Sequence, residues 1–486
     1  MRKVGALLAI ASLPSKYGIG DFGKTAYEFV DILSKMGMKV WQVLPLNPLG
    51  FGNSPYQPYS SFAGDEIYIS LDKLVNLNLL DTSDLVNFNE LSTKIDYVSV
   101  RENKAKMLTK AFQNYLKDKV LLNQVSEFTE NTAWVYNYAV FLTLKKANNL
   151  QPWNEWKEEH KNWINDKKFD LTPYNEQIQY ELFIQYIFFK QWYELKSYVN
   201  DSGIEIVGDI PIYLGFDSLD VWENQDIFLL DENQNPTFIA GVPPDYFSAT
   251  GQRWGNPLYD WKKLEDTDFQ FWVDRLRGNM SMYDVIRIDH FRAFDTYWKI
   301  PAICKTAIDG EWVEAPGYKL FDTIYKKLPD IKIISEDLGD LRPEVLELRD
   351  HYNLPGMNVF QFNYKVNSNN NSMTETTNTI VYTGTHDNDT LLGWYLGLSK
   401  YKRKQIKREF KANESNINNK IIKEVLKYKA NCIIFPVQDI IGLDNIARIN
   451  YPGKIGSPNW EWKLANFNAL NHEQEHMNKI INIEVK

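Results

Sequence analysis

The stretch that decides the fold is Tyr283-Asp-Val-Ile-Arg-Ile-Asp289, a short run of valine and isoleucine that ends in an aspartate. Similar apolar runs recur along the chain at residues 4–11, 39–45, 203–209, 331–336, 379–387 and 431–436. Such runs are typical of parallel strands that are buried on both faces. Helical patterns lie between them at residues 25–36, 269–280, 317–328 and 400–429. The alternation predicts an α/β fold, either a barrel or a doubly wound sheet.

Four of these runs end in a carboxylate, at Asp209, Asp289, Glu336 and Asp387. In a parallel barrel the carboxyl ends of the strands meet on one face, and the active site is built there. A single aspartate in such a place can equally cap a helix. Because four carboxylates are hard to explain as caps, we predict a TIM-type (β/α)8 barrel with its active site at these strand ends.

The domain organisation follows from two interruptions of the strand-helix rhythm. We expect residues 1–486 to form a single catalytic (β/α)8 barrel. Residues 72–202 have mostly helical patterns and predict a helical insertion subdomain. Residues 231–259 are rich in proline, glycine and aromatic residues and show no periodicity. Long loops in compact domains are often functional, so this segment is predicted to be an active-site loop.

The composition is that of a globular protein, with 44% hydrophobic and 24% charged residues among 486. The net charge of −9 argues against nucleic acid or an anionic membrane as the main partner. Residues 4–11 after Arg2 and Lys3 resemble a short signal peptide, but no cleavage site follows, and a buried strand is the better interpretation. With only Cys304 and Cys432, no disulfide framework is possible, and we expect a cytoplasmic protein.

Two short patterns suggest other functions. Gly18-Ile-Gly-Asp-Phe-Gly23 matches the dinucleotide-binding pattern, but four residues separate it from the preceding strand and the next strand ends without an acid. His472-Glu-Gln-Glu-His476 matches the helix of zinc proteases, but it lies close to the end of the sequence and lacks a clear third ligand. We therefore expect neither a cofactor nor a metal.

The neighbours of two carboxylates predict different chemical roles. In the strand that ends at Asp289, Arg287 shares its face, and the guanidinium favours the charged carboxylate that a nucleophile needs. Glu336 shares a face with Ile334 and precedes Asp337, so it should keep its proton longer, as a general acid must. The alternative for Arg287 and Asp289 is a structural ion pair. Two such carboxylates with a third nearby are suited to the cleavage of a glycosidic bond.

Aromatic residues make up 14% of the chain, which is a high share. Flat rings stack on the apolar faces of sugars. The rings around the predicted active-site loop are Trp222, Tyr246, Phe247, Trp254 and Tyr259. For each of them taken singly, packing in the core is the more common role.

At these residues the chain resembles a known family, the 4-alpha-glucanotransferases (amylomaltase or disproportionating enzyme) of glycoside hydrolase family 77. The resemblance runs nearly end to end and covers Ser12-Leu-Pro14, Tyr17-Gly-Ile-Gly-Asp-Phe-Gly23, Ser54-Pro-Tyr-Gln57, Ser61-Phe-Ala-Gly64, Gly208-Asp-Ile-Pro211, Gly241-Val-Pro-Pro-Asp-Tyr-Phe247, Gly251-Gln-Arg-Trp-Gly-Asn-Pro257, Arg287-Ile-Asp-His-Phe-Arg292, Ser335-Glu-Asp-Leu-Gly339, Thr385-His-Asp-Asn388 and Asn459-Trp460.

The resemblance implies Asp289 as nucleophile, Glu336 as general acid and base, and Asp387 as stabiliser of the transition state. It further implies a set of substrate-binding residues around them, which are Ser54, Tyr56, Asp209, Tyr246, Trp254, Arg287, His290, His386 and Asn459. The implied partners are maltooligosaccharides and α-glucans. Two alternatives stay open, an α-amylase-type hydrolase and a catalytically silent glucan-binding protein, and the sequence leaves the oligomeric state open.

Overall fold

The computed structural model describes residues 2–85, 92–244, 248–365 and 378–485. Its centre is a sheet of eight parallel strands in the order β10-β11-β12-β1-β2-β3-β6-β9. The strands are β1 (Lys3–Leu7), β2 (Val40–Gln42), β3 (Glu205–Pro211), β6 (Val285–Asp289), β9 (Ile333–Ser335), β10 (Gly356–Val359), β11 (Thr379–Tyr382) and β12 (Cys432–Pro436). The amide of Ser335 donates to the carbonyl of Pro355 over 3.0 Å and so links the two ends of the sheet. This is the predicted (β/α)8 barrel.

Each run that was predicted as a strand overlaps one of these strands. The apolar stretch near the N-terminus is β1, which lies between β2 and β12 in the middle of the sheet. The strand that the sequence analysis missed is β10, because Gly356-Met-Asn-Val359 has a glycine and an asparagine where the other strands have valine or isoleucine.

Helices cover the outside of the barrel. They include α1 (Lys24–Met36), α11 (Gln270–Met282), α12 (Gly317–Lys327), α13 (Pro343–His351), α15 (Leu391–Gly397), α16 (Lys400–Glu409), α17 (Ile417–Val425), α18 (Val437–Ile440) and α19 (Asn468–Glu484). The helical stretch predicted at 400–429 is two helices, because the side chain of Asn413 accepts the amides of Ser415 and Asn416 and forms a turn between them. Within the described ranges, every helix is too short or too polar to span a bilayer.

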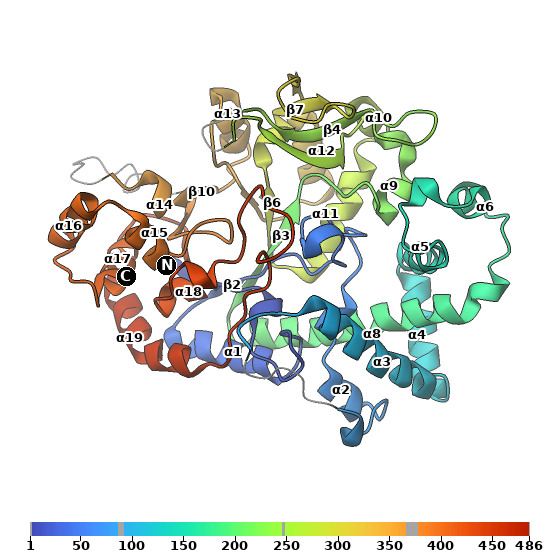
Figure 1. Ribbon diagram of the computed structural model, residues 1–486, viewed down its shortest axis with the longest axis horizontal. Coiled ribbons are helices and arrows are strands. Elements are labelled where there is room, and N and C mark those ends of the chain that lie inside the picture. The colour runs from blue at the N-terminus through green and yellow to red at the C-terminus, as the bar shows by residue number, and fades with distance from the viewer. Residues whose placement is uncertain (1, 86–91, 245–247, 366–377, 486) are drawn as a thin grey trace.

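The predicted insertion at 72–202 consists mainly of helices in the part that the structure describes. Its helices are α3 (Tyr97–Tyr115), α4 (Lys119–Asn131), α5 (Val135–Ala147), α6 (Glu158–Lys161), α7 (Trp163–Asp166) and α8 (Asn175–Asp201). In Figure 1 the helices α4, α5 and α6 lie at the right, away from the central strands. The long helix α8 contacts both α5 and the barrel elements α1 and β3. The last helix of the predicted insertion therefore also forms part of the barrel wall.

The segment 231–259 was predicted without regular structure, and this was wrong. It contains β4 (Phe238–Val242) and β5 (Gln252–Pro257), which join β7 (Thr296–Pro301) and β8 (Glu311–Glu314) in a sheet of order β5-β4-β7-β8. This sheet lies at the top of Figure 1. Its pairing, such as Gly241 with Trp298, joins residues far apart in the chain, and local periodicity does not reveal such pairs.

The inside of the barrel is apolar along the strands and polar at their carboxyl ends, which form the upper end of the barrel. Alternate residues of the strands form one buried cluster, composed of Leu7, Val40, Val207, Ile334, Met357, Val359, Ile380, Tyr382, Cys432 and Ile434. Because side chains alternate along a strand, the next inward positions after Val207, Val285 and Ile334 are Asp209, Arg287 and Glu336. The apolar cluster therefore lies inside the barrel directly below these charged groups.

Truncation of a side chain in this apolar cluster should destabilise the protein. Ile434 is fully buried in the cluster, and Ile434→Ala should lower the free energy of unfolding by about 2–5 kcal/mol through lost burial and a residual cavity. The matched control is Ile303→Ala, because Ile303 is 92% exposed and its loss should cost no more than about 0.5 kcal/mol. Urea unfolding measures both variants. An equal effect of the two would contradict the placement of Ile434 in a packed interior.

Candidate active site

Three of the predicted carboxylates lie side by side at the upper end of the barrel. In the register of β3 and β6, Asp209 pairs with Arg287 and Pro211 pairs with Asp289. In the register of β6 and β9, Ile288 pairs with Ser335, so that Asp289 and Glu336 are the next residues on neighbouring strands. Asp209 does not end its strand as predicted, because β3 continues to Pro211 and leaves Asp209 one pleat deeper than Asp289. The strand order and register thus bring these groups to one place.

Arg287 connects two of these carboxylates. Its Nη1 lies 2.6 and 2.8 Å from the two oxygens of Asp209, and its Nη2 lies 2.9 Å from Oδ1 of Asp289. The side chains of Arg287 and Asp209 are 3% and 0% exposed, whereas that of Asp289 is 31% exposed. Burial raises the pKa of Asp209, and the guanidinium opposes this shift. The predicted position of Arg287 beside Asp289 is confirmed. Of the two carboxylates that Arg287 contacts, that of Asp289 is the more accessible.

Glu336 is held by backbone amides. Its Oε2 accepts from the amide of His290 at 2.7 Å, and its Oε1 accepts from the amide of Leu338 at 3.0 Å. His290 has φ of 55°, a left-handed conformation that is uncommon for a residue with a side chain. A non-glycine residue in this region is strained, and such residues cluster at functional sites.

The pKa of Glu336 is raised from its ordinary value to about 8, first by burial and then by the negative charge of Asp289. The direction agrees with the predicted retention of the proton. Burial agrees with the predicted apolar face that Glu336 shares with Ile334. The predicted contribution of Asp337 is wrong, because Asp337 pairs with Arg349 and with the amide of Met357, and the neighbouring charge is that of Asp289.

Asp387 reaches the same place from the loop that follows β11. The hydroxyl of Tyr56 donates to Oδ2 of Asp209 at 2.8 Å and lies 2.9 Å from Nε2 of His386. The rings of Tyr56 and His386 are stacked with centroids 5.2 Å apart. His386 Nε2 in turn lies 3.4 Å from Oδ2 of Asp387. A continuous line of contacts therefore runs from Asp289 through Arg287, Asp209, Tyr56 and His386 to Asp387.

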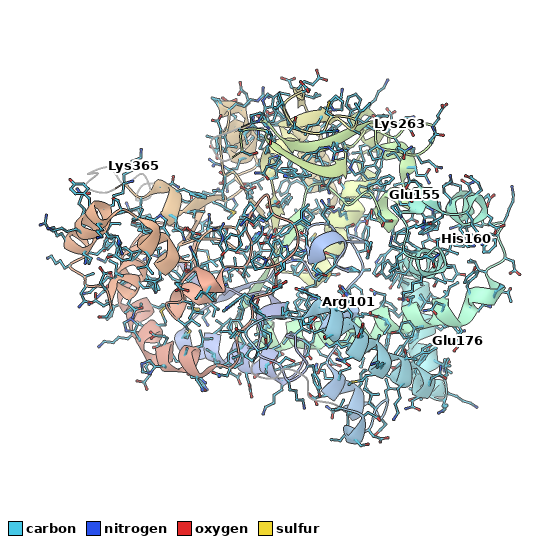
Figure 2. The ribbon with its side chains drawn as sticks, in the orientation of Figure 1. Arg101, Glu155, His160, Glu176, Lys263 and Lys365 are labelled. Atoms are coloured by element: carbon cyan, nitrogen blue, oxygen red, sulfur yellow. The ribbon has the colours of Figure 1, made fainter. Side chains whose placement is uncertain are left out.

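The loop after β2 carries Tyr56 and is anchored by the helical insertion. Oγ of Ser54 accepts the amide of Tyr56 at 3.3 Å, which shapes the turn before that tyrosine. Asp65 at the far end of the loop accepts the amide of Leu49 at 2.8 Å and forms an ion pair with Arg101 at 2.8 Å. Arg101 belongs to α3 and is labelled near the middle of Figure 2. The insertion thus supports the position of the site loop.

Trp254 and His290 also meet at the site. The two rings form an edge-to-face pair with centroids 4.9 Å apart and an interplanar angle of 89°. The side chain of Gln57 donates to the carbonyl of Trp254 at 3.0 Å and so ties β5 to the loop that bears Tyr56. Burial lowers the pKa of His290 to about 4, so its imidazole is neutral at neutral pH.

The other residues that the sequence analysis named are buried or lie outside the described residues. Asn459 is buried, its Oδ1 accepts the amide of Tyr451, and its Nδ2 donates to the carbonyl of Lys454 at 2.8 Å. These bonds brace its own loop, and a contact of Asn459 with sugar stays a prediction. Trp222 and Tyr259 are buried in the core, where their rings pack on other aromatic residues. Tyr246 and Phe247 lie outside the described residues.

The sequence analysis missed three residues that contact the loop of Asp387. Nδ2 of Asn450 donates to Oδ1 of Asp387 at 2.6 Å, and Nη2 of Arg448 donates to the carbonyl of Asp387 at 2.7 Å. The third residue, Asp439, is fully buried and bonds Thr383 and Leu391 at the two ends of the loop. A signal for Asp439 was present, because it follows β12 by three residues and so repeats the pattern of acids behind apolar runs.

The two patterns that suggest other functions lie on a helix and in a connection between a strand and a helix. His472 and His476 are exposed on α19, and within the described ranges no three residues of His, Cys, Asp and Glu are grouped so that they could hold a metal ion. The glycines of Gly18 to Gly23 lie in the connection between β1 and α1, and Gly23 is the N-cap of that helix.

A (β/α)8 barrel with carboxylates gathered at one end is suited to the class of barrel enzymes that cleave and form glycosidic bonds. The family model of 4-alpha-glucanotransferase, glycoside hydrolase family 77, matches residues 8–469. A 4-alpha-glucanotransferase of Clostridium butyricum is 43% identical over 96% of both chains, and one of Thermus thermophilus is 40% identical over 95% of both. The solved structure titled amylomaltase from Streptococcus agalactiae in complex with acarbose has 36% identity and a TM-score of 0.95, and covers 100% of each chain.

The chain therefore belongs to the 4-alpha-glucanotransferase family and is a glycosyl-transferring enzyme.

The hydroxyl of Tyr56 should be important for the site. Tyr56→Phe removes one donor to buried Asp209 and the contact with His386, and this should lower kcat/KM by about 5- to 100-fold. Tyr352→Phe is the matched control, since it removes a hydroxyl that bonds an aspartate at the surface, Asp322 at 2.7 Å. Rates of glucose release from maltotriose measure both variants. A Tyr56→Phe variant as active as Tyr352→Phe would contradict the inferred line of contacts.

Proposed function

We propose that the chain transfers segments of α-1,4-glucans to the 4-hydroxyl of glucose or of another glucan, by a double displacement that retains the α configuration. The observation that carries this proposal is the line of contacts that joins Asp289, Asp209 and Asp387, with Glu336 bonded to the amide of the residue after Asp289. Retaining enzymes need a charged nucleophile and a protonated acid beside the same anomeric carbon.

In the first step Asp289 attacks the anomeric carbon of the donor, and Glu336 gives its proton to the oxygen of the leaving glucan. Nη2 of Arg287 lies 2.9 Å from Oδ1 of Asp289, so a positive charge faces the carboxylate that attacks. The raised pKa of Glu336 supports its role as the acid. In the second step the 4-hydroxyl of the acceptor gives its proton to Glu336 and displaces Asp289. Two inversions retain the α configuration.

The remaining groups would bind the sugar that is attacked. We assign Asp387 to stabilisation of the positive charge that develops on this sugar, and the neighbouring side chains to its hydroxyls, namely Ser54, Tyr56, Asp209, Arg287, His290 and His386. Neutral His290 can bond a hydroxyl without adding a positive charge beside the developing oxocarbenium ion. Trp254 supplies an apolar face, and Tyr246 is proposed for the same role.

Transfer requires that water is kept from the covalent intermediate. We assign this shielding to segment 231–259, because Trp254 in β5 packs against His290, the residue after the nucleophile. The α-glucan substrate class is supported by the acarbose in the Streptococcus agalactiae relative. A cytoplasmic location is proposed because Cys304 and Cys432 are both free thiols.

The product profile from maltotriose tests the proposal. A transferase should release glucose and longer maltooligosaccharides while the number of reducing ends stays constant. Chromatography of the products and a reducing-end assay on the same samples measure both quantities. A rising number of reducing ends would identify a hydrolase, and the absence of any product would identify a binding protein.

The pH dependence tests the role of Glu336. Its raised pKa keeps the acid protonated below about pH 8, so kcat/KM for maltotriose should fall as the pH rises through this value. Maltotriosyl fluoride is the control donor, because fluoride leaves without a proton and its kcat/KM should lack this basic limb. Asp289→Asn should abolish the turnover of both donors. An identical basic limb for both donors would contradict the assignment of Glu336 as the acid.

A further inference from the structure

The loop that carries Asp387 is tied to the barrel by a buried carboxylate that the reaction itself does not use. Asp439 lies on α18, just beyond β12, and is 0% exposed. Its Oδ2 accepts the hydroxyl of Thr383 at 2.5 Å, and its Oδ1 accepts the amide of Leu391 at 2.7 Å. We infer that Asp439 is a positioning residue that holds Asp387 in its working place.

The two donors mark the ends of the loop. Thr383 is the first residue after β11, and Leu391 is the first residue of α15. Asp387 lies midway between them. One carboxylate therefore fixes both points at which the loop leaves regular structure, whereas Arg448 and Asn450 hold Asp387 itself. A side chain on a loop is placed well when both ends and the tip of the loop are fixed.

The charge of Asp439 is hard to explain by stability alone. Within the described part of the chain, no lysine, arginine or histidine forms an ion pair with it, and burial raises its pKa to about 7. Burying a carboxylate that only neutral donors satisfy costs free energy. A carboxylate does offer two acceptor oxygens to two donors at once, which an amide side chain cannot do. This geometry matches the need to clamp two separate backbone points.

Other groups hold the second half of the loop. The side chain of Gln361 donates to the carbonyl of Asp389 at 2.7 Å, Oδ1 of Asn445 accepts the amide of Thr390 at 3.0 Å, and Arg448 forms an ion pair with Asp389. His386 Nδ1 and Gln438 Oε1 are buried without a hydrogen-bond partner among the described residues, and both residues line the same small cavity together with Asp439. Asp439 differs from these groups because its two oxygens bond both ends of the loop at once. The inference rests on the proposed role of Asp387 as stabiliser of the transition state.

A matched pair of variants at Thr383 tests the contact with Asp439 without removing the buried acid. Thr383→Ser keeps the hydroxyl donor and should keep kcat, whereas Thr383→Val has a similar shape, lacks the donor and should lower kcat. Asp439→Asn places an amide NH2 against one of the two donors and should act likewise. We expect losses in kcat of about 10- to 100-fold with KM for maltotriose nearly unchanged, because displacement of a group that acts in the transition state affects kcat. A loss confined to KM, or equal losses for Thr383→Ser and Thr383→Val, would overturn the inference.

A double-mutant cycle separates positioning from a general structural role. Asp439→Asn is combined with Asp387→Asn, and fluoride release from maltotriosyl fluoride measures the remaining rate. If Asp439 acts through Asp387, its substitution should cost nothing further once Asp387 is neutral. Equal costs in both backgrounds would overturn the inference. Full activity of Asp387→Asn alone would instead refute the proposed role of Asp387, and if Asp439→Asn fails to fold, Thr383→Val takes its place in the cycle.

Discussion

The buried guanidinium of Arg287 is the interaction on which the site depends. A charge in this position is tolerable only when it is paired with good geometry, since removal of one partner leaves an uncompensated buried charge. Arg287 meets Asp209 through two close contacts and Asp289 through a third, and this requires the register in which Asp209 faces Arg287 across β3 and β6. The register between β3 and β6 therefore also fixes the position of the nucleophile Asp289.

The same constraint extends outward to two loops. Asp209 keeps a second partner in Tyr56, and Tyr56 contacts His386, so that loops after β2 and β11 are joined to the charged centre. Each loop has its own support behind it. Arg101 of the helical insertion holds the loop of Tyr56 through Asp65, and Arg448, Asn450 and Asp439 surround the loop of Asp387. The barrel strands place the charged groups, and the elements around the barrel support the loops that carry Tyr56 and Asp387.

Sequence reasoning predicted correctly those features that depend on residues close together in the chain. Apolar runs of valine and isoleucine predicted strands such as β6, and side-chain alternation placed Arg287 beside Asp289 and Ile334 below Glu336. It failed where a strand lacks such residues, as in β10, and where pairing is between distant segments, as in β4 and β7. It also overlooked Asp439, because only acids that end an apolar run were considered and the run before Asp439 ends at Pro436.

The sequence by itself determined the class of fold, the family and the acids that could do the chemistry, because periodicity and motif spacing are written in neighbouring residues. Only the tertiary structure decided which side chains meet. Tyr56 reaches Asp209 across 153 residues and His386 across 330, and the causes that raise the pKa of Glu336 are burial and Asp289. Contacts over such separations depend on strand register and loop closure, which arise from the packing of the whole barrel.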